Sequence, residues 1–110
     1  MSNILICDDE KDIVSALRIC LAAEGYEIFE AYNGMEALNV IRQNDIHLVL
    51  LDIMMPEMDG ISTLAKIREN YNMPVLFISA KSEDADKILG LNIGADDYIT
   101  KPFNIIEVVA

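Results

Sequence analysis

The sequence LVLLD at residues 48–52 is a short apolar run that ends on a single aspartate. The run is too short for a helix, and a segment that is apolar throughout, without alternation, is typical of a strand covered on both faces. Two further short runs have the same character, at Ile4–Cys7 and at Val75–Ile78. Weaker strand candidates lie at Glu27–Ala31 and at Asp97–Ile99.

Between these strands the apolar spacing changes to that of helices. Helical faces are predicted within residues 13–21, 37–41, 61–67, 88–91 and 105–109. Strict alternation of strands and helices predicts an α/β fold, flavodoxin-like and doubly wound, with a five-stranded parallel sheet in the order 2-1-3-4-5. We expect one domain over residues 1–110, whose last helix the end of the chain truncates.

The composition narrows the class of protein. Hydrophobic residues make up 53% of 110 residues, which excludes disorder, and two cysteines are too few for a disulfide framework. Cys7 and Cys20 are therefore predicted to be reduced core thiols. The net charge of −11 opposes contact of this segment with nucleic acid or an anionic membrane. With no membrane span and no basic region of a secretory signal at the N-terminus, a cytoplasmic location is expected.

Polar residues follow four of the five predicted strands. Asp8-Asp9-Glu10, Asp52 and Ser79 come directly after the first, third and fourth strands, and Thr100-Lys101-Pro102 follows the fifth. In such a sheet these ends converge on one edge, where ligands bind. Two carboxylates ~4 Å apart repel by about 4 kcal/mol at an effective dielectric near 20, so the cluster should take up protons or a cation. Hard oxygen ligands suit Mg²⁺, and an aspartate beside it can accept a phosphoryl group.

Each of these residues also has an ordinary structural explanation. The acidic triplet at residues 8–10 could be the favourable N-terminal charge of a helix, and Asp52 could form a turn. Ser79 alone could be a cap, and Lys101 a solvated surface charge. The functional interpretation is favoured because four independent strand ends would otherwise have to agree by chance.

In combination these residues carry a family resemblance. The set Asp8-Asp9, Asp52, Ser79-Ala80 and Lys101-Pro102-Phe103, with MPEMDG at residues 55–60, resembles the response-regulator receiver domain of two-component signalling. The stretch GADDYITKPF at residues 94–103 is most similar to the OmpR/PhoB subfamily. Members of that subfamily carry a C-terminal winged-helix DNA-binding domain, and we expect that effector domain to be absent from this chain.

The resemblance implies a phosphoacceptor switch rather than an enzyme acting on a separate substrate. Asp52 would be phosphorylated by a partner histidine kinase and would ligate Mg²⁺ with Asp9. Asp8 would ligate the ion mainly through water, and Met54 through its backbone carbonyl. Ser79 would donate a hydrogen bond to a phosphoryl oxygen.

The resemblance also implies a switch and an output face. Lys101 would pair with a phosphoryl oxygen, and its bond to Pro102 would be cis. Tyr98 would be the aromatic switch residue, coupled to Ser79. The face of the last two helices and the last strand would form a two-fold dimer on phosphorylation, controlling a C-terminal transcription regulator. The interface residues expected there are Lys87, Asp96, Asp97 and Glu107.

Three other functions fit the sequence less well than this switch. A phosphatase of the haloacid dehalogenase type needs a second aspartate at position 54, where this chain has Met54. A flavodoxin-like electron carrier needs a phosphate-binding loop after the first strand, where the acidic residues 8–10 would repel a flavin phosphate. A receiver that works only as an interaction module, without phosphorylation, would not need every acceptor-site position filled.

Overall fold

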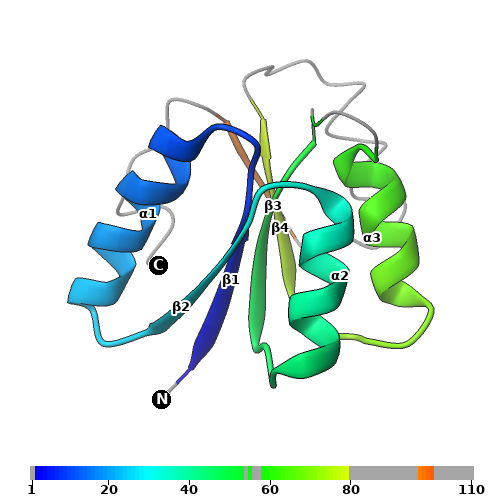
Figure 1. Ribbon diagram of the computed structural model, residues 1–110, viewed down its shortest axis with the longest axis horizontal. Helices are drawn as coiled ribbons and strands as arrows, with labels where there is room; N and C mark the ends of the chain where they lie inside the picture. Colours follow the sequence, from blue (N-terminus) through cyan, green and yellow to red (C-terminus); the bar gives the residue numbers. More distant parts are fainter. Residues whose placement is uncertain (1, 54, 56–57, 80–96, 101–110) are drawn as a thin grey trace.

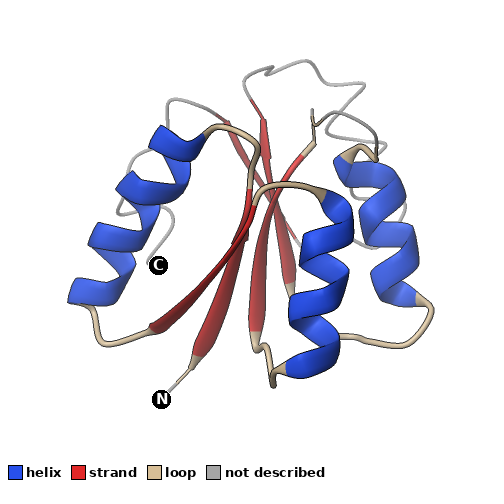
Figure 2. Ribbon diagram, viewed as in Figure 1, coloured by secondary structure: helices blue, strands red, loops and turns tan. Residues whose placement is uncertain are grey.

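The computed structural model describes residues 2–53, 55, 58–79 and 97–100, and Figures 1 and 2 show its alternating strands and helices. The strands are β1 (Asn3–Cys7), β2 (Glu27–Ala31), β3 (Leu48–Asp52), β4 (Val75–Ser79) and β5 (Asp97–Thr100). The helices are α1 (Lys11–Ala23), α2 (Gly34–Gln43) and α3 (Gly60–Arg68). The helices predicted within 88–91 and 105–109 lie outside the described residues. In the described part of the chain, no helix combines the length and apolar character of a membrane span.

The five strands form one parallel sheet in the order β2-β1-β3-β4-β5, which confirms the predicted flavodoxin-like topology. The chain passes from β1 outward to β2 and then returns to β3 on the other side of β1. The direction of winding therefore reverses between β1 and β3, and such a reversal is where α/β sheets bind ligands. Cys7 pairs with Leu51 across these strands, so Asp8 and Asp52 follow at the same level.

The sheet is covered on both faces, as its continuous apolar strands require. Figure 2 shows α1 on one face and α2 with α3 on the other. Alternate residues of β1 serve the two cores: Ile4 and Ile6 pack with the buried face of α1, whereas Leu5 and Cys7 belong to the core beneath α2 and α3. All four are at most 2% exposed, which explains why these strands show no polar alternation.

Side-chain caps fix the starts of two helices close to the acidic edge of the sheet. The Asn33 side chain accepts a hydrogen bond from the Glu36 N–H (2.9 Å), and the Glu36 carboxylate accepts one from the Tyr32 N–H (2.8 Å). Asn33 is thus the N-cap residue of α2, and Glu36 reaches back to the residue before the cap, in a variant of the capping box. Asp59 caps α3 by accepting from the Ser62 N–H at 2.7 Å. Both helices begin directly after these caps, and they contain the helical faces predicted within residues 37–41 and 61–67.

Candidate functional site

Three aspartates lie together at the carboxyl ends of β1 and β3. One carboxylate oxygen each from Asp8, Asp9 and Asp52 lies within 4.8 Å of the other two. The parallel register explains this, because Cys7 lies opposite Leu51 and the chains continue side by side into their acidic ends. The sequence-based expectation that these carboxylates converge is met.

The three carboxylates differ in burial. Asp8 is 0% exposed and Asp52 is 2% exposed, whereas Asp9 is open to solvent. One Asp8 oxygen accepts a hydrogen bond from the Glu10 N–H at 2.9 Å. Gathering buried negative charges is unfavourable unless protons or a cation compensate. A cluster of carboxylate oxygens, with an open side at Asp9, suits a hard divalent ion such as Mg²⁺, which keeps part of its water shell.

The alternative that the acidic triplet merely serves the dipole of α1 does not fit Asp8 and Asp9. The helix begins at Lys11, and Glu10 is its N-cap residue without a side-chain cap hydrogen bond. The acidic residue in the first turn is Asp12. Asp8 and Asp9 therefore precede the helix, and their convergence with Asp52 is set by the sheet.

The backbone around Asp52 depends on a glycine whose role the sequence prediction underestimated. The Gly60 N–H donates to the Ile53 carbonyl at 2.8 Å, so the first turn of α3 lies against the end of β3. A Cβ atom at Gly60 would collide with the Asp52 carbonyl oxygen and lie 2.7 Å from the Ile53 Cα. The sequence indicated only a turn and a helix entry here, because a contact between backbones leaves no periodic signal.

We expect Gly60→Ala to lower the free energy of unfolding by about 2 kcal/mol, since rigid backbone atoms must move to admit the methyl group. Gly34→Ala is the matched control, because a Cβ there would meet the Thr63 hydroxyl and the Met58 side chain, which are side-chain atoms. Its loss should be smaller, because side chains can move away without displacing the main chain, although Thr63 would have to weaken its hydrogen bond to the Asp59 carbonyl. Urea unfolding of both variants measures the difference, and equal losses would contradict the role given to backbone contact at Gly60.

The buried Cys7 thiol contacts two loops near the site. Cys7 is 0% exposed, and its Sγ donates to the Asn33 carbonyl (3.4 Å) and to the Met55 Sδ (3.6 Å). Burial, with the negative charges of Asp8 and Asp52 as smaller contributions, raises the pKa of the Cys7 thiol far above its ordinary value. The thiol therefore stays protonated and unreactive. Its prediction as a reduced core residue is confirmed, whereas Cys20 is only half-buried.

Several predicted site residues are placed by their main chain alone. Ser79 is the last residue of β4 and pairs with Thr100 of β5, and both Asp52 and Ser79 end their strands instead of following them. Asp97 and Tyr98 lie in β5. The other predicted positions lie outside the described residues: Met54, Lys87, Asp96, Lys101, Pro102 and Glu107. The roles expected of these residues remain predictions.

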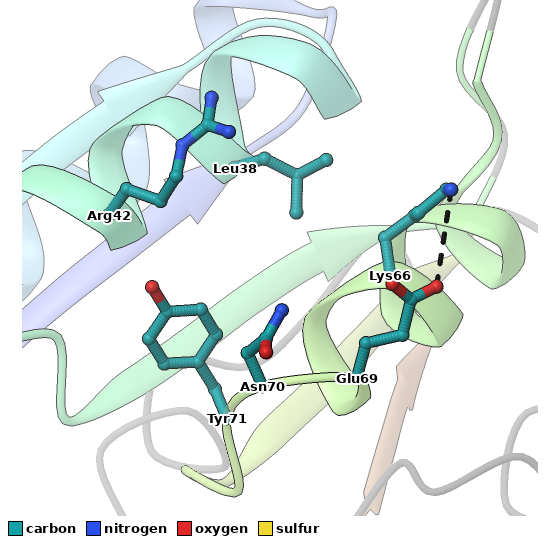
Figure 3. Close-up of a pocket in the computed structure, with 6 residues that line it drawn as sticks. All are labelled: Leu38, Arg42, Lys66, Glu69, Asn70 and Tyr71. Atoms are coloured by element: carbon teal, nitrogen blue, oxygen red, sulfur yellow. Dashed lines mark ion pairs between the residues drawn. The ribbon is translucent and has the colours of Figure 1, made fainter.

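A separate hollow of about 170 Å³ lies between the C-terminal ends of α2 and α3, shown in Figure 3. Its lining comprises Leu38, Arg42, Lys66, Glu69, Asn70 and Tyr71. Lys66 and Glu69 form an exposed ion pair across 4.0 Å. Basic residues at helix C-termini are favoured by the helix dipole, which explains Arg42 and Lys66 without a ligand. The hollow lies at the ends of α2 and α3 remote from the caps Asn33 and Asp59, and so from the three aspartates.

Comparison with known families gives a match over almost the whole chain. The family model of the response regulator receiver domain matches residues 4–110. Response regulator GtcR of Aneurinibacillus migulanus is 50% identical over 108 residues, which are 98% of this chain and 45% of that protein. The chain therefore spans less than half the length of this relative.

Solved structures agree with the fold. The receiver domain of the Francisella response regulator 1452 is 39% identical, with a TM-score of 0.93 over 99% of this chain and 91% of that one. A two-component response regulator from Clostridium difficile is 34% identical, with a TM-score of 0.96 over 99% and 90%. TrrA from Thermotoga maritima, solved in complex with Mg(2+)-BeF, is 35% identical, with a TM-score of 0.88 over 99% and 94%.

Proposed function

Because this chain belongs to the response regulator receiver domains of two-component signalling, we propose that Asp52 is its phosphoacceptor. The observation that carries the proposal is the convergence of Asp52 with Asp8 and Asp9 within 4.8 Å at the switch point of the sheet. A histidine kinase is the expected phosphodonor, since receiver domains act with such kinases in two-component systems.

In the proposed reaction a carboxylate oxygen of Asp52 attacks the phosphorus of the donor. The new P–O bond forms as the P–N bond of a phosphohistidine, or the P–O bond of an acyl phosphate, breaks. The imidazole leaves with a proton from solvent, or the acyl group leaves as a carboxylate, and the product is an aspartyl phosphate. Asp52 is thus the nucleophile, and its burial restricts water around the reacting oxygen.

The metal partner of this reaction is Mg²⁺, which the family binds at its acidic pocket. We propose that Asp8, Asp9 and Asp52 hold the ion, with the backbone carbonyl of Met54. When bound, Mg²⁺ supplies positive charge that offsets the carboxylates and the phosphoryl oxygens. The buried and hydrogen-bonded Asp8 keeps the loop before α1 in place, while exposed Asp9 leaves a side of the site open for exchange.

Finer assignments extend the proposal along the rest of the chain. Ser79 and Lys101 would bind the phosphoryl oxygens, and Tyr98 with Pro102 would carry the change to the dimer face. The GADDYITKPF stretch at residues 94–103 supports an OmpR/PhoB-type regulator with a C-terminal DNA-binding domain beyond the receiver of residues 1–110. GtcR, more than twice as long as the matched part, is consistent with a further domain. We propose the cytoplasm as the location of this protein.

The chemical nature of the bound phosphate tests the proposal. After incubation with acetyl phosphate and Mg²⁺, we expect one phosphoryl group per chain that hydroxylamine removes, as it does from acyl phosphates but not from phosphoserine. Chelation of Mg²⁺ should prevent incorporation. Intact-mass spectrometry measures both. Incorporation that resists hydroxylamine would contradict an aspartyl phosphate, and no incorporation with Mg²⁺ present would favour a receiver that works without phosphorylation.

A further inference from the structure

A lysine beside the acidic site lies over an aromatic ring. The Lys11 Nζ is 5.6 Å from the centroid of the Tyr32 ring, within the range of a cation–π interaction. Lys11 is the exposed first residue of α1, with Glu10 and Asp12 as its chain neighbours. Even so, among the ion pairs found between described residues, none includes Lys11. The contact that holds its ammonium is therefore the Tyr32 ring, and no carboxylate among the described residues pairs with it.

Tyr32 is held by hydrogen bonds at its main-chain N–H and at its hydroxyl, so its ring is already in position to hold the Lys11 ammonium. Its N–H donates to the Glu36 carboxylate at 2.8 Å, and its hydroxyl donates to Glu30 Oε1 at 3.3 Å. The other Glu30 oxygen is held by Arg18 at 3.0 Å. The aromatic ring thus connects the loop after β2 with α1 through contacts on both sides.

The acidic site needs such a charge for electrostatic reasons. A phosphodonor is an anion, and it must approach three clustered carboxylates on a chain of net charge −11. Repulsion of this kind slows association, and a cation at the entrance offsets it. Lys11 follows Asp9 by two residues, so their Cα atoms are at most ~7 Å apart. The Asp8 N–H donates to the Ala31 carbonyl at 3.1 Å, so the loop that carries Tyr32 also begins beside the aspartates.

We propose that Lys11 is a steering charge for the anionic phosphodonor and that Tyr32 is the positioning residue that holds it at the entrance. This inference rests on the proposed phosphoacceptor function of Asp52. The proposal can be distinguished from a structural role of Lys11, because a positive charge attracts the donor anion and repels Mg²⁺. Lys11 should speed the arrival of the donor anion and weaken the binding of Mg²⁺.

The test compares Lys11→Gln with Lys66→Gln, which removes the same unit charge from an exposed position in the last turn of α3, remote from the three aspartates and from Tyr32. For Lys11→Gln at low ionic strength we expect Mg²⁺ binding, measured by calorimetry, to become about twofold tighter. The second-order rate constant with acetyl phosphate should fall about two- to threefold, and the fall should disappear in high salt. Lys66→Gln should change both quantities much less. Tyr32→Leu keeps the lysine but frees it, and should give part of the Lys11→Gln effect on the rate.

Equal effects of Lys11→Gln and Lys66→Gln would overturn the proposal, because net charge alone would explain them. Changes of the same sign in Mg²⁺ affinity and donor rate would also overturn it, since a structural defect weakens both. Failure of the wild-type chain to take up phosphate at Asp52 would instead contradict the proposed function. The Mg²⁺ measurement would still decide in that case, because an unchanged affinity in Lys11→Gln would show that its charge does not act at the site.

Discussion

Replacing Asp52 with asparagine is expected to abolish phosphoryl incorporation while leaving the fold intact. The side chains have the same shape, so the nearly closed space at the end of β3 stays filled. The amide, however, is not a nucleophile at neutral pH, and no aspartyl phosphate can form. Loss of one of three neighbouring negative charges should also leave the free energy of unfolding unchanged or raise it. Intact-mass spectrometry after treatment with acetyl phosphate and Mg²⁺ measures incorporation, and urea unfolding measures stability.

Asp59→Asn is the matched control for this experiment. Asp59 is exposed and caps α3, and asparagine is an equally good N-cap residue, so both stability and incorporation should remain near the wild-type values. If Asp52→Asn incorporated phosphate at the wild-type rate, the acceptor would lie elsewhere. The three aspartates would then be a metal site without a nucleophile.

Much of this fold could be predicted from the sequence because its signals are local. The unbroken apolar runs at Ile4–Cys7 and Val75–Ile78 require cover on both faces, and a sheet alternating with helices supplies it. Gly25, at φ +95°, follows the end of α1, and glycine is the residue that adopts this backbone conformation without strain. The strand ends were each predicted one residue short at Asp52 and Ser79. Both residues are polar but belong to the strands through main-chain pairing, which hydrophobic spacing does not encode.

The sequence predicted which side chains of the site come together, because the strand topology alone decides that. It did not predict how deeply each side chain is buried or which residues of neighbouring elements touch. Parallel strands bring Asp8 and Asp52 together whatever their neighbours are. The complete burial of Asp8 beside exposed Asp9 depends on how the loops cross above the sheet. The contact between Lys11 and Tyr32 likewise joins the first residue of α1 to the loop after β2. Neither the burial of Asp8 nor the contact of Lys11 with Tyr32 can be predicted from a single sequence, because both depend on how the helices, strands and loops pack against one another.

Removing Asp9 is expected to have opposite effects on metal binding and on metal-free stability. Loss of an outer partner of a metal ligand already costs ~10–100-fold in affinity, so Asp9→Ala, which removes a proposed ligand, should weaken Mg²⁺ binding at least as much. Without the ion, the same change relieves repulsion from Asp8 and Asp52 across less than 4.8 Å. Because Asp9 is exposed, screening limits this gain to about 1 kcal/mol. Calorimetry with Mg²⁺ and urea unfolding in a chelator measure the two effects.

Asp12→Ala separates this local repulsion from a general effect of removing negative charge. Asp12 is the acidic residue in the first turn of α1, where the helix dipole favours it, so its loss should lower metal-free stability slightly and leave Mg²⁺ affinity nearly unchanged. Opposite signs for the two neighbouring aspartates are the expected result. If Asp9→Ala were destabilising without Mg²⁺, the carboxylates would not be repelling one another in the folded chain. Proton uptake or hydrogen bonding would then have to compensate their charge, and the electrostatic reason for a divalent ion at this site would be lost.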